Sequence, residues 1–379
     1  MSAHANPDIV DDGLVFIYDT DDGKSYKGEP TTNLITSGGI DFSERSGYTN
    51  LQTSQVVDSR SPSGYACEME ILDGANINPA ARSSFGQGTN MPSSGNAFVS
   101  IFAKFEGGTS SNITPKIYNG SGTAWQSLSP LDGGSAYLTS GYRRFGYYGA
   151  ITANPGFSMA KGNSNKQTGQ KTRWHSPQVE LKSHATQFVN GTRSATQGLI
   201  DRTNNSTIDI SNASFDSNAQ MVFDGTDDII NTGLFAGRNP STQPFTIEAI
   251  VKSDTTSGGR MWLDATSNGT NQRLYCAHAA TGTGNPMGIQ GSAWSSSGVS
   301  DTDYHHYVIV MDGSVARLYN NGEAHSTKNY TSYQLQALNI GGRNTYIWLG
   351  DIPIFKLYDR ALATEEILQN YNATKSRFA

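Results

Sequence analysis

Carboxylates two residues apart on one strand are the pattern that could catalyse glycan hydrolysis, because such a pair lies on one face. A retaining glycosidase holds its acid and its nucleophile about 5–5.5 Å apart. Glu68 and Glu70 alternate in this way, but Cys67, Met69 and Ile71 occupy the other face. This pattern is typical of an amphipathic strand whose polar side meets solvent. No other predicted strand carries such a pair, so we predict that the protein is not an enzyme.

Aspartates gather in short runs that could bind calcium, a cation that prefers oxygen ligands. The run DGTDD contains Asp224, Asp227 and Asp228, and DTDDG occupies residues 19–23. The spacing of an EF-hand loop is missing, and aspartates in turns commonly accept hydrogen bonds from nearby backbone. No His-x-His or Cys-x-x-Cys spacing indicates zinc. We therefore predict no required cofactor, with calcium at Asp224, Asp227 and Asp228 as the candidate metal site.

Sugar binding needs an exposed aromatic ring with amide or carboxylate partners, because a pyranose has an apolar face and a polar rim. We select Trp294, Trp125 and Tyr346 as candidate ligand-binding residues. Trp294 is the first choice, because its segment QGSAWSSSG offers no strand on which it could pack. Trp348 lies inside an apolar terminal strand and is assigned to the core, as most such aromatics are.

The composition favours many short strands joined by tight turns. Of 379 residues, 41 are glycine and only 16% are charged, and Ser, Thr and Asn fill the spaces between short aromatic and β-branched runs. The net charge of −6 gives no general attraction to nucleic acid. No apolar run approaches the roughly 18–20 residues that span a bilayer. We predict an all-β protein that neither binds nucleic acid nor inserts into a membrane.

Apolar alternation bounded by Gly, Ser or Asn predicts a series of strands. They cover residues 13–18, 66–72, 97–106, 115–120, 142–151, 174–181, 245–253, 260–266 and 273–279, followed by a hairpin over 305–323 that turns at Asp312-Gly313. Two further short strands, ending near residues 348 and 357, fold back on each other and end a sheet. Thr364, before Glu365 and Glu366, predicts the N-cap of one short helix that runs to about residue 371.

Three segments carry a family resemblance: DTDDGKSYKGEPTTNL at 19–34, MVFDGTDD at 221–228, and the terminal run at 338–371. They resemble the laminin-G-like, concanavalin A-like lectin/glucanase domains found in virion proteins of tailed bacteriophages. In that family the opening segment leads directly into the next strands, whereas here the continuation follows only after Gly198. The resemblance implies a discontinuous domain, residues 1–30 plus 196–379, with a second domain, 31–195, inserted at a surface loop.

The end of the insert resembles the last strand of carbohydrate-binding-module-like jelly rolls in phage tail and virion proteins. The matching positions are Gln178, Glu180, Ala185, Thr186 and Phe188. The implied fold is two β-sandwich (jelly-roll) domains with a short C-terminal helix. The two cysteines, at positions 67 and 276, fall in different domains, so we expect free thiols and no disulfide.

The resemblance implies a non-enzymatic structural protein on the exterior of a tailed bacteriophage particle, as a fibre, decoration or adhesin-like subunit. Its expected partners are other virion proteins, further copies of itself and a glycan of the host surface. Its expected location is the virion, after synthesis in the host cytoplasm. Two alternatives stay open, because a fold does not fix a function: a dedicated carbohydrate-binding module protein, and a glycan hydrolase, against which the missing carboxylate pair argues.

Overall fold

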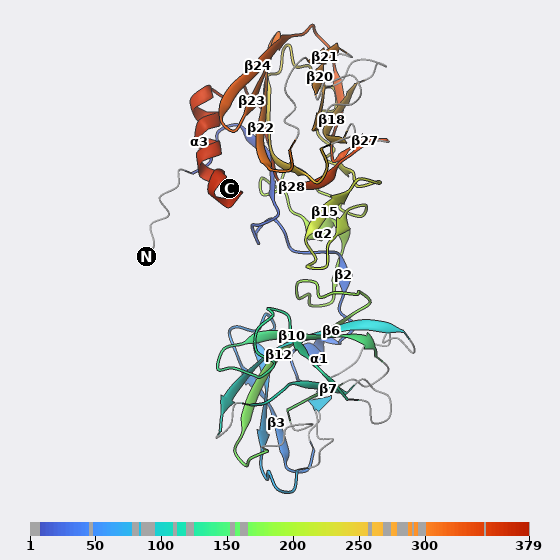
Figure 1. Ribbon diagram of the computed structural model, residues 1–379, viewed down its shortest axis with the longest axis vertical. Helices are drawn as coiled ribbons and strands as arrows, with labels where there is room; N and C mark the ends of the chain where they lie inside the picture. The colour runs from blue at the N-terminus through green and yellow to red at the C-terminus, as the bar shows by residue number, and fades with distance from the viewer. Residues whose placement is uncertain are drawn as a thin grey trace. The chain divides into compact units, whose positions relative to one another are not determined.

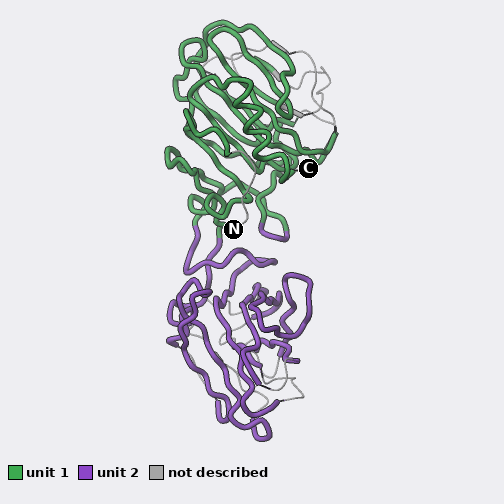
Figure 2. The backbone as a smooth tube through the Cα atoms, turned by 90° about the vertical axis from the view of Figure 1, so that its left-hand side faces the viewer, with its two compact units in different colours: residues 1–30, 194–216, 220–379 green, residues 31–193, 217–219 purple. Residues whose placement is uncertain are grey.

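The chain forms two compact units, coloured separately in Figure 2. Unit 1 comprises Met1–Pro30, Ser194–Asp216 and Gln220–Ala379, and unit 2 comprises Thr31–Arg193 and Ser217–Ala219. The computed structural model describes residues 8–44, 48–77, 83–84, 95–108, 112–118, 125–151, 156–159, 166–256, 260–267, 274–278, 287–289, 292–294, 301–344 and 346–378. Unit 1 is built from segments on both sides of unit 2 in the sequence.

Unit 1 is a β-sandwich (Figure 1). Its first sheet, sheet 1, has the order β14-β15-β28-β17-β22-β23-β24, and β1 also pairs with β28. The strands are β1 (Leu14–Asp19), β14 (Ser214–Phe215), β15 (Met221–Asp224), β17 (Phe245–Ser253), β22 (Tyr304–Asp312), β23 (Val315–Asn320), β24 (Glu323–Asn329) and β28 (Leu349–Tyr358). Phe16 lies opposite Leu357 and Tyr18 opposite Phe355. The strand predicted at 13–18 thus joins a sheet otherwise formed by residues after 213.

The second sheet of unit 1, sheet 2, has the order β16-β25-β18-β19-β20-β21, and β27 joins it through β18. Its strands are β16 (Ile230–Asn231), β18 (Arg260–Ser267), β19 (Leu274–His278), β20 (Met287–Ile289), β21 (Ser292–Trp294), β25 (Leu335–Ile340), β26 (Gly342–Arg343) and β27 (Tyr346–Ile347). The core lies between the two sheets, where Trp262, Phe355 and Leu338 are buried.

Helix α3 (Thr364–Thr374) covers the outer face of sheet 1, beside β22 and β23 in Figure 1. Val308, Tyr358 and Ile367 form a smaller apolar cluster between the helix and the sheet. Strand β17 is therefore covered on both faces, which explains its nearly continuous apolar sequence FTIEAIVKS. A 3₁₀ turn, η1 (Lys375–Arg377), follows the helix.

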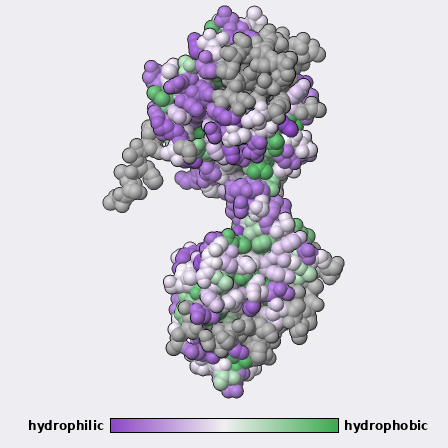
Figure 3. Space-filling view, in the orientation of Figure 1, coloured by the Kyte–Doolittle hydropathy of each residue, from purple (hydrophilic) through white to green (hydrophobic). Residues whose placement is uncertain are grey.

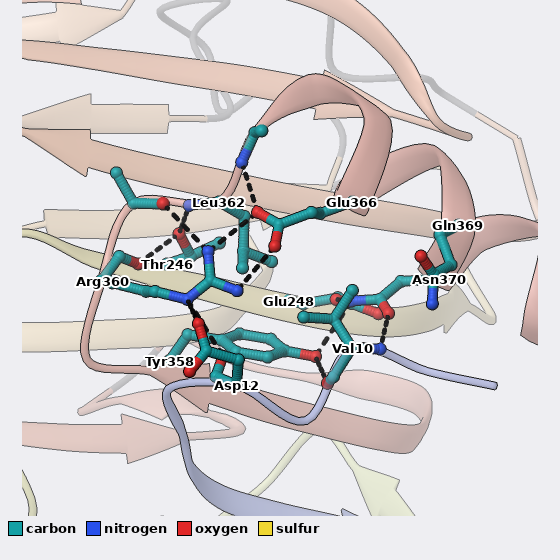
Figure 4. Close-up of polar contacts among 12 residues, drawn as sticks. Val10, Asp12, Thr246, Glu248, Tyr358, Arg360, Leu362, Glu366, Gln369 and Asn370 are labelled. Atoms are coloured by element: carbon teal, nitrogen blue, oxygen red, sulfur yellow. Dashed lines mark hydrogen bonds and ion pairs between the residues drawn. The ribbon is translucent and has the colours of Figure 1, made fainter.

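A buried polar network ties α3 and the N-terminal segment to sheet 1 (Figure 4). Glu248 is fully buried in β17, and Lys356 Nζ of β28 lies 2.5 Å from its Oε1. Asn370 of α3 donates to Glu248 Oε2 at 2.6 Å and accepts from Val10 N at 2.8 Å. Tyr358 donates to Val10 O at 3.0 Å. Burial alone would raise the pKa of Glu248, but the charges of its cationic neighbours hold it down to about 2.

Unit 2 is a second sandwich, with a six-stranded sheet in the order β3-β4-β12-β6-β10-β9 and a smaller sheet in the order β5-β11-β7-β8. The strands are β3 (Leu51–Val57), β4 (Tyr65–Ile71), β5 (Ser83–Ser84), β6 (Asn96–Gly107), β7 (Lys116–Tyr118), β8 (Trp125–Ser127), β9 (Ser129–Pro130), β10 (Arg143–Ala150), β11 (Gly156–Ser158) and β12 (Lys171–Glu180). Trp174, Phe145 and Phe157 are buried between the sheets. Cys67 lies in this core and Cys276 in the core of unit 1, and the two form no disulfide with each other.

The buried carboxylate of Glu180 gives a structural role to part of the motif predicted at the end of the insert. It forms hydrogen bonds with residues near both ends of unit 2. It accepts hydrogen bonds from Thr31 Oγ1 at 2.9 Å, Gln178 Nε2 at 2.9 Å and Thr186 N at 2.9 Å. The motif residues Gln178, Glu180 and Thr186 are therefore structural. Short strands β2 (Thr31–Thr32) and β13 (Thr192–Arg193) pair next to them, and helices α1 (Ser37–Ile40) and α2 (Ala195–Gly198) complete the elements.

Two local predictions about the C-terminal region are wrong. Strands β25 and β28 do not fold back on each other, because the chain crosses between them from sheet 2 to sheet 1 through the small hairpin β26–β27. Thr364 is the first residue of α3 and not its N-cap, which is Ala363. The free N–H of Ala363 is bound instead by the Glu366 carboxylate at 2.8 Å, so the predicted first-turn acid supplies the cap.

The first and last residues of the 31–193 segment of unit 2 lie next to each other, so this segment can be removed without separating the two parts of unit 1. Its removal tests directly whether unit 1 is a discontinuous domain. Thr32 pairs with Thr192, and their hydroxyl oxygens lie 3.1 Å apart. We expect a fragment of residues 31–193 to fold alone, and a chain with a short Gly/Ser linker in its place to retain folded unit 1. Thermal unfolding and amide chemical-shift dispersion measure both. Loss of cooperative unfolding in both proteins would contradict the arrangement.

The described surface of unit 1 visible in Figure 3 is largely hydrophilic, with small hydrophobic areas. Such a surface is normal for a domain that meets water on that face. Among the helices that the structure describes, none has the length and apolar character needed to cross a bilayer.

Candidate functional site

The three aromatic residues predicted to bind ligand do not form one site. Trp125 belongs to unit 2, where its ring lies 5.4 Å from that of Tyr118. Tyr346 lies in β27 of unit 1 and is 43% exposed. Trp294 pairs with Met287 at the end of β21, so it lies in a strand and not in a loop as predicted. Its side chain lies outside the described residues. Four strand spacings of about 4.8 Å separate β27 from β21, or about 19 Å.

Trp348 is a core residue, as predicted. Its side chain is fully buried, and its Nε1 donates to Asp351 O at 3.2 Å. A buried indole with a satisfied N–H contributes apolar burial without an unpaired polar group.

The predicted calcium residues do come together, because ligand oxygens of Asp224, Asp227 and Asp228 lie within 4.8 Å of one another. Burial raises the pKa of Asp228 to about 6, and this carboxylate accepts a hydrogen bond from Asp224 N. Arg260 places a cation at the same turn by donating to Gly225 O at 2.7 Å. Calcium takes six to eight oxygen ligands. The cluster offers three carboxylates next to the positive charge of Arg260, an arrangement that also suits a turn stabilised by hydrogen bonds alone. Calcium at this cluster stays a prediction.

Glu68 and Glu70 lie on the outer face of the larger sheet of unit 2. Arg173 Nε lies 2.9 Å from Glu68, and Lys171 Nζ lies 3.1 Å from Glu70. Arg173 also contacts Glu106 at 3.2 Å. Cations on the neighbouring strand thus neutralise both carboxylates, as is typical of cross-strand charge pairs.

A pocket of about 380 Å³, here called the aromatic pocket, opens where α3 ends against β22. Residues from four parts of unit 1 line it: Ile250 of β17; Tyr304, His305 and His306 of β22; Asn321 after β23; and Tyr371, Thr374, Lys375, Ser376 and Phe378 of the C-terminal segment. Three aromatic rings thus share one concave surface with amide, hydroxyl, imidazole and ammonium groups. This is the combination that sugar recognition requires.

Tyr304 is held at the mouth of the aromatic pocket by contacts on two sides. Its ring centroid lies 5.1 Å from that of Phe378, at an interplanar angle of 52°. Its hydroxyl donates to Asp351 Oδ2 at 2.9 Å. Burial and this hydrogen bond raise the pKa of Tyr304 well above its usual value, so the hydroxyl stays protonated. Tyr304 is a positioned ring and not a titrating group at neutral pH.

His306 gives the aromatic pocket a buried polar atom. The residue is 2% exposed, and Nε2 lies 3.0 Å from Glu248 Oε1. A carboxylate only accepts, so Nε2 faces an acceptor. Among the described residues, neither Nδ1 nor Nε2 has a hydrogen-bond partner of good geometry. A buried polar atom without a partner costs free energy unless a ligand or water satisfies it.

Sequence reasoning did not select Tyr304, Tyr371 or Phe378 as ligand-binding residues. Tyr371 lies near the end of α3, and Phe378 follows η1. Nothing in the sequence indicated that β22 is their partner, because the contact joins segments more than sixty residues apart.

Residues 224–368 match the family model Laminin_G_3, described as the concanavalin A-like lectin/glucanases superfamily. The match runs from β15 to α3 and lies wholly within unit 1. Over these residues, unit 1 is therefore similar to the concanavalin A-like domains. A comparison with curated proteins gives no match.

Several solved structures are similar to part of the chain at low identity. The chain is 14% identical to the binding domain of botulinum neurotoxin serotype G, over 46% of this chain and 48% of that one, with a TM-score of 0.34. It is 13% identical to domain 4 of AbnA, a GH43 extracellular arabinanase from Geobacillus stearothermophilus, in complex with arabinotriose; the match covers 47% of this chain and 93% of that one, with a TM-score of 0.33. The chain spans about half the length of the toxin binding domain.

Proposed function

We propose that the protein binds glycans through unit 1 without hydrolysing them, as a structural protein on the exterior of a tailed bacteriophage particle. The observation that carries the glycan part is the aromatic pocket, where Tyr304, Tyr371 and Phe378 lie beside polar groups. Within the described residues of unit 1, this pocket offers three rings to one ligand. The lectin-like fold of residues 224–368 supports the same ligand class.

The virion setting rests on the resemblance of residues 19–34, 221–228 and 338–371 to domains of phage virion proteins. In this proposal the partners are other virion proteins, further copies of the chain and a host-surface glycan. Many copies on one particle suit a weak site, because linked sites raise avidity by about 10² to 10⁴ over a single one. A shallow pocket with millimolar affinity is then sufficient for attachment.

A glycan array with the purified full chain tests the proposal, followed by titration calorimetry with the best-bound glycan. We expect selective binding of a subset of glycans and no release of shorter sugars on prolonged incubation. The physical reason for the second result is the neutralised Glu68 and Glu70 pair. Sugar release that is lost on changing one Asp or Glu would show a hydrolase. Absence of any bound glycan would refute the binding role.

Trp294, the first choice from the sequence, is a competing location for the glycan-binding site. If Trp294 forms the platform, Trp294→Ala removes attachment to cells and changes stability by no more than about 0.5 kcal/mol, as is usual for an exposed residue. We expect the aromatic pocket to carry the binding, so Trp294→Ala should retain affinity for the array-selected glycan within about twofold. Calorimetry and a thermal melt on the same sample measure both quantities. Loss of binding with an unchanged melt would move the site to Trp294.

A further inference from the structure

A second pocket of unit 1 shares the Tyr304–Phe378 ring pair with the aromatic pocket. It has a volume of about 220 Å³, and Tyr304 and Phe378 line both pockets. The rest of its lining is Thr20, Asp21, Asp216, Gln220, Met221, Val222, Asp351, Ile352 and Pro353. The ring pair therefore lines two neighbouring pockets in unit 1. The aromatic pocket falls near the lower end of the range of drug-sized ligand sites, roughly 300–1,000 Å³, and the second pocket is smaller than that range.

The two pockets differ in charge. The lining of the aromatic pocket contains Lys375 and two histidines and no carboxylate. The lining of the second pocket, here called the acidic pocket, contains Asp21, Asp216 and Asp351 and no cationic side chain. One ligand that spans both would meet hydrogen-bonding and cationic groups at one end and carboxylates at the other.

Nearby cations do not balance the acidic pocket. Arg377 lies 3.1 Å from Asp21, but it also holds Asp19 at 2.6 Å. Lys252 sits over the Tyr304 ring, 5.6 Å from its centroid. Asp254 adds a further negative charge close to Asp351. Among the residues that the structure describes, carboxylates therefore outnumber the cations around this pocket, which favours a cationic group in its occupant.

On the basis of the proposed glycan binding, we propose that the ring pair separates two sugar subsites and that the acidic pocket takes an amino sugar with a free ammonium group. The ring faces of Tyr304 and Phe378 pack against the apolar faces of adjacent sugars. Asp216 and Asp351 accept hydrogen bonds from the ammonium, and charge-assisted bonds of this kind are about twice as strong as neutral ones. At the other end, His306 Nδ1 forms a hydrogen bond with a sugar hydroxyl, which can donate or accept.

The test uses two probes that differ only in their amino groups: the β-1,4-linked disaccharide of glucosamine and its N,N′-diacetylated counterpart. Acetylation removes the positive charge, so calorimetry with the full chain should give at least tenfold tighter binding of the free amine. Asp216→Asn should reduce this ratio to below threefold and leave the affinity for the acetylated probe unchanged. Asp216 is only partly buried, so this variant is expected to fold; a thermal melt checks it.

The matched control is Glu323→Gln, which removes one exposed carboxylate from β24. It should keep the full preference, and an equal loss there would mean that net charge alone attracts the amine, which overturns the inference. Equal affinity for the two probes, preference for the acetylated one, or no binding of either overturns it as well. The proposed function survives these results if array-selected glycans still bind in a Tyr304-dependent way, and falls only if that binding is absent.

Discussion

Replacing Glu248 by Gln is expected to lower the free energy of unfolding of unit 1 by about 3–5 kcal/mol. The substitution leaves Lys356, which is 1% exposed, as a buried charge without its carboxylate partner. It also weakens the bond to Asn370, which holds α3 and the N-terminal segment in place. Urea unfolding followed by far-ultraviolet circular dichroism measures the loss.

Two comparisons make the Glu248 result specific. Glu248→Gln combined with Lys356→Met removes both charges and should be less destabilising than Glu248→Gln alone, because no uncompensated ion remains. The exposed control Glu323→Gln should change stability by less than about 0.5 kcal/mol. A double variant no more stable than the single one would show that the network is not held by the ion pair.

The same carboxylate gives a pH dependence with a definite sign. The pKa of Glu248 in the folded chain is about 2, below its ordinary value of 4.5. A depressed carboxyl pKa stabilises the fold above the ordinary pKa, and this contribution is lost as pH falls from about 4.5 towards 2. The difference between wild type and Glu248→Gln should therefore shrink by roughly 3 kcal/mol over that range. A difference that stays constant from pH 7 to pH 2.5 would contradict the assignment.

Tyr304→Ala is expected to weaken binding of the array-selected glycan by about 30-fold, which corresponds to about 2 kcal/mol for a central aromatic contact. The ring lines both pockets and packs against Phe378. Tyr304→Phe keeps the ring and loses only the bond to Asp351, so it should retain affinity within about threefold. Phe378→Ala should resemble Tyr304→Ala. If Tyr304→Ala binds like wild type, the ring pair does not contact the ligand.

Much of the fold could be predicted from the sequence, because the strands of unit 1 and unit 2 carry strong local patterns. The turn between β22 and β23 is an example: Asp312 pairs with Val315 across two residues, and Gly313 adopts a φ of +71° that glycine accepts readily. The β-sandwich class and the short helix followed from such signals. Sheet membership did not, since β25 and β28 have similar apolar sequences but lie in different sheets.

The candidate site was harder to predict, because its residues do not form a motif. Tyr304 begins a strand, Phe378 lies after the last helix, and Asp351 belongs to a third element. Each has an ordinary structural explanation when it is considered alone. Trp294 attracted attention because it is a large aromatic residue among glycines and serines, yet its neighbours pair as β20 and β21. Convergence in space, and not residue type, distinguishes the aromatic pocket.

The most direct test of glycan binding at the ring pair is a crystal structure of the full chain with the array-selected glycan bound. We expect sugar density on both sides of the Tyr304–Phe378 pair, with a hydroxyl within hydrogen-bond distance of His306 Nδ1. Sugar density at Trp294, at Trp125 or at Tyr346, with both pockets of unit 1 holding only water, would contradict it.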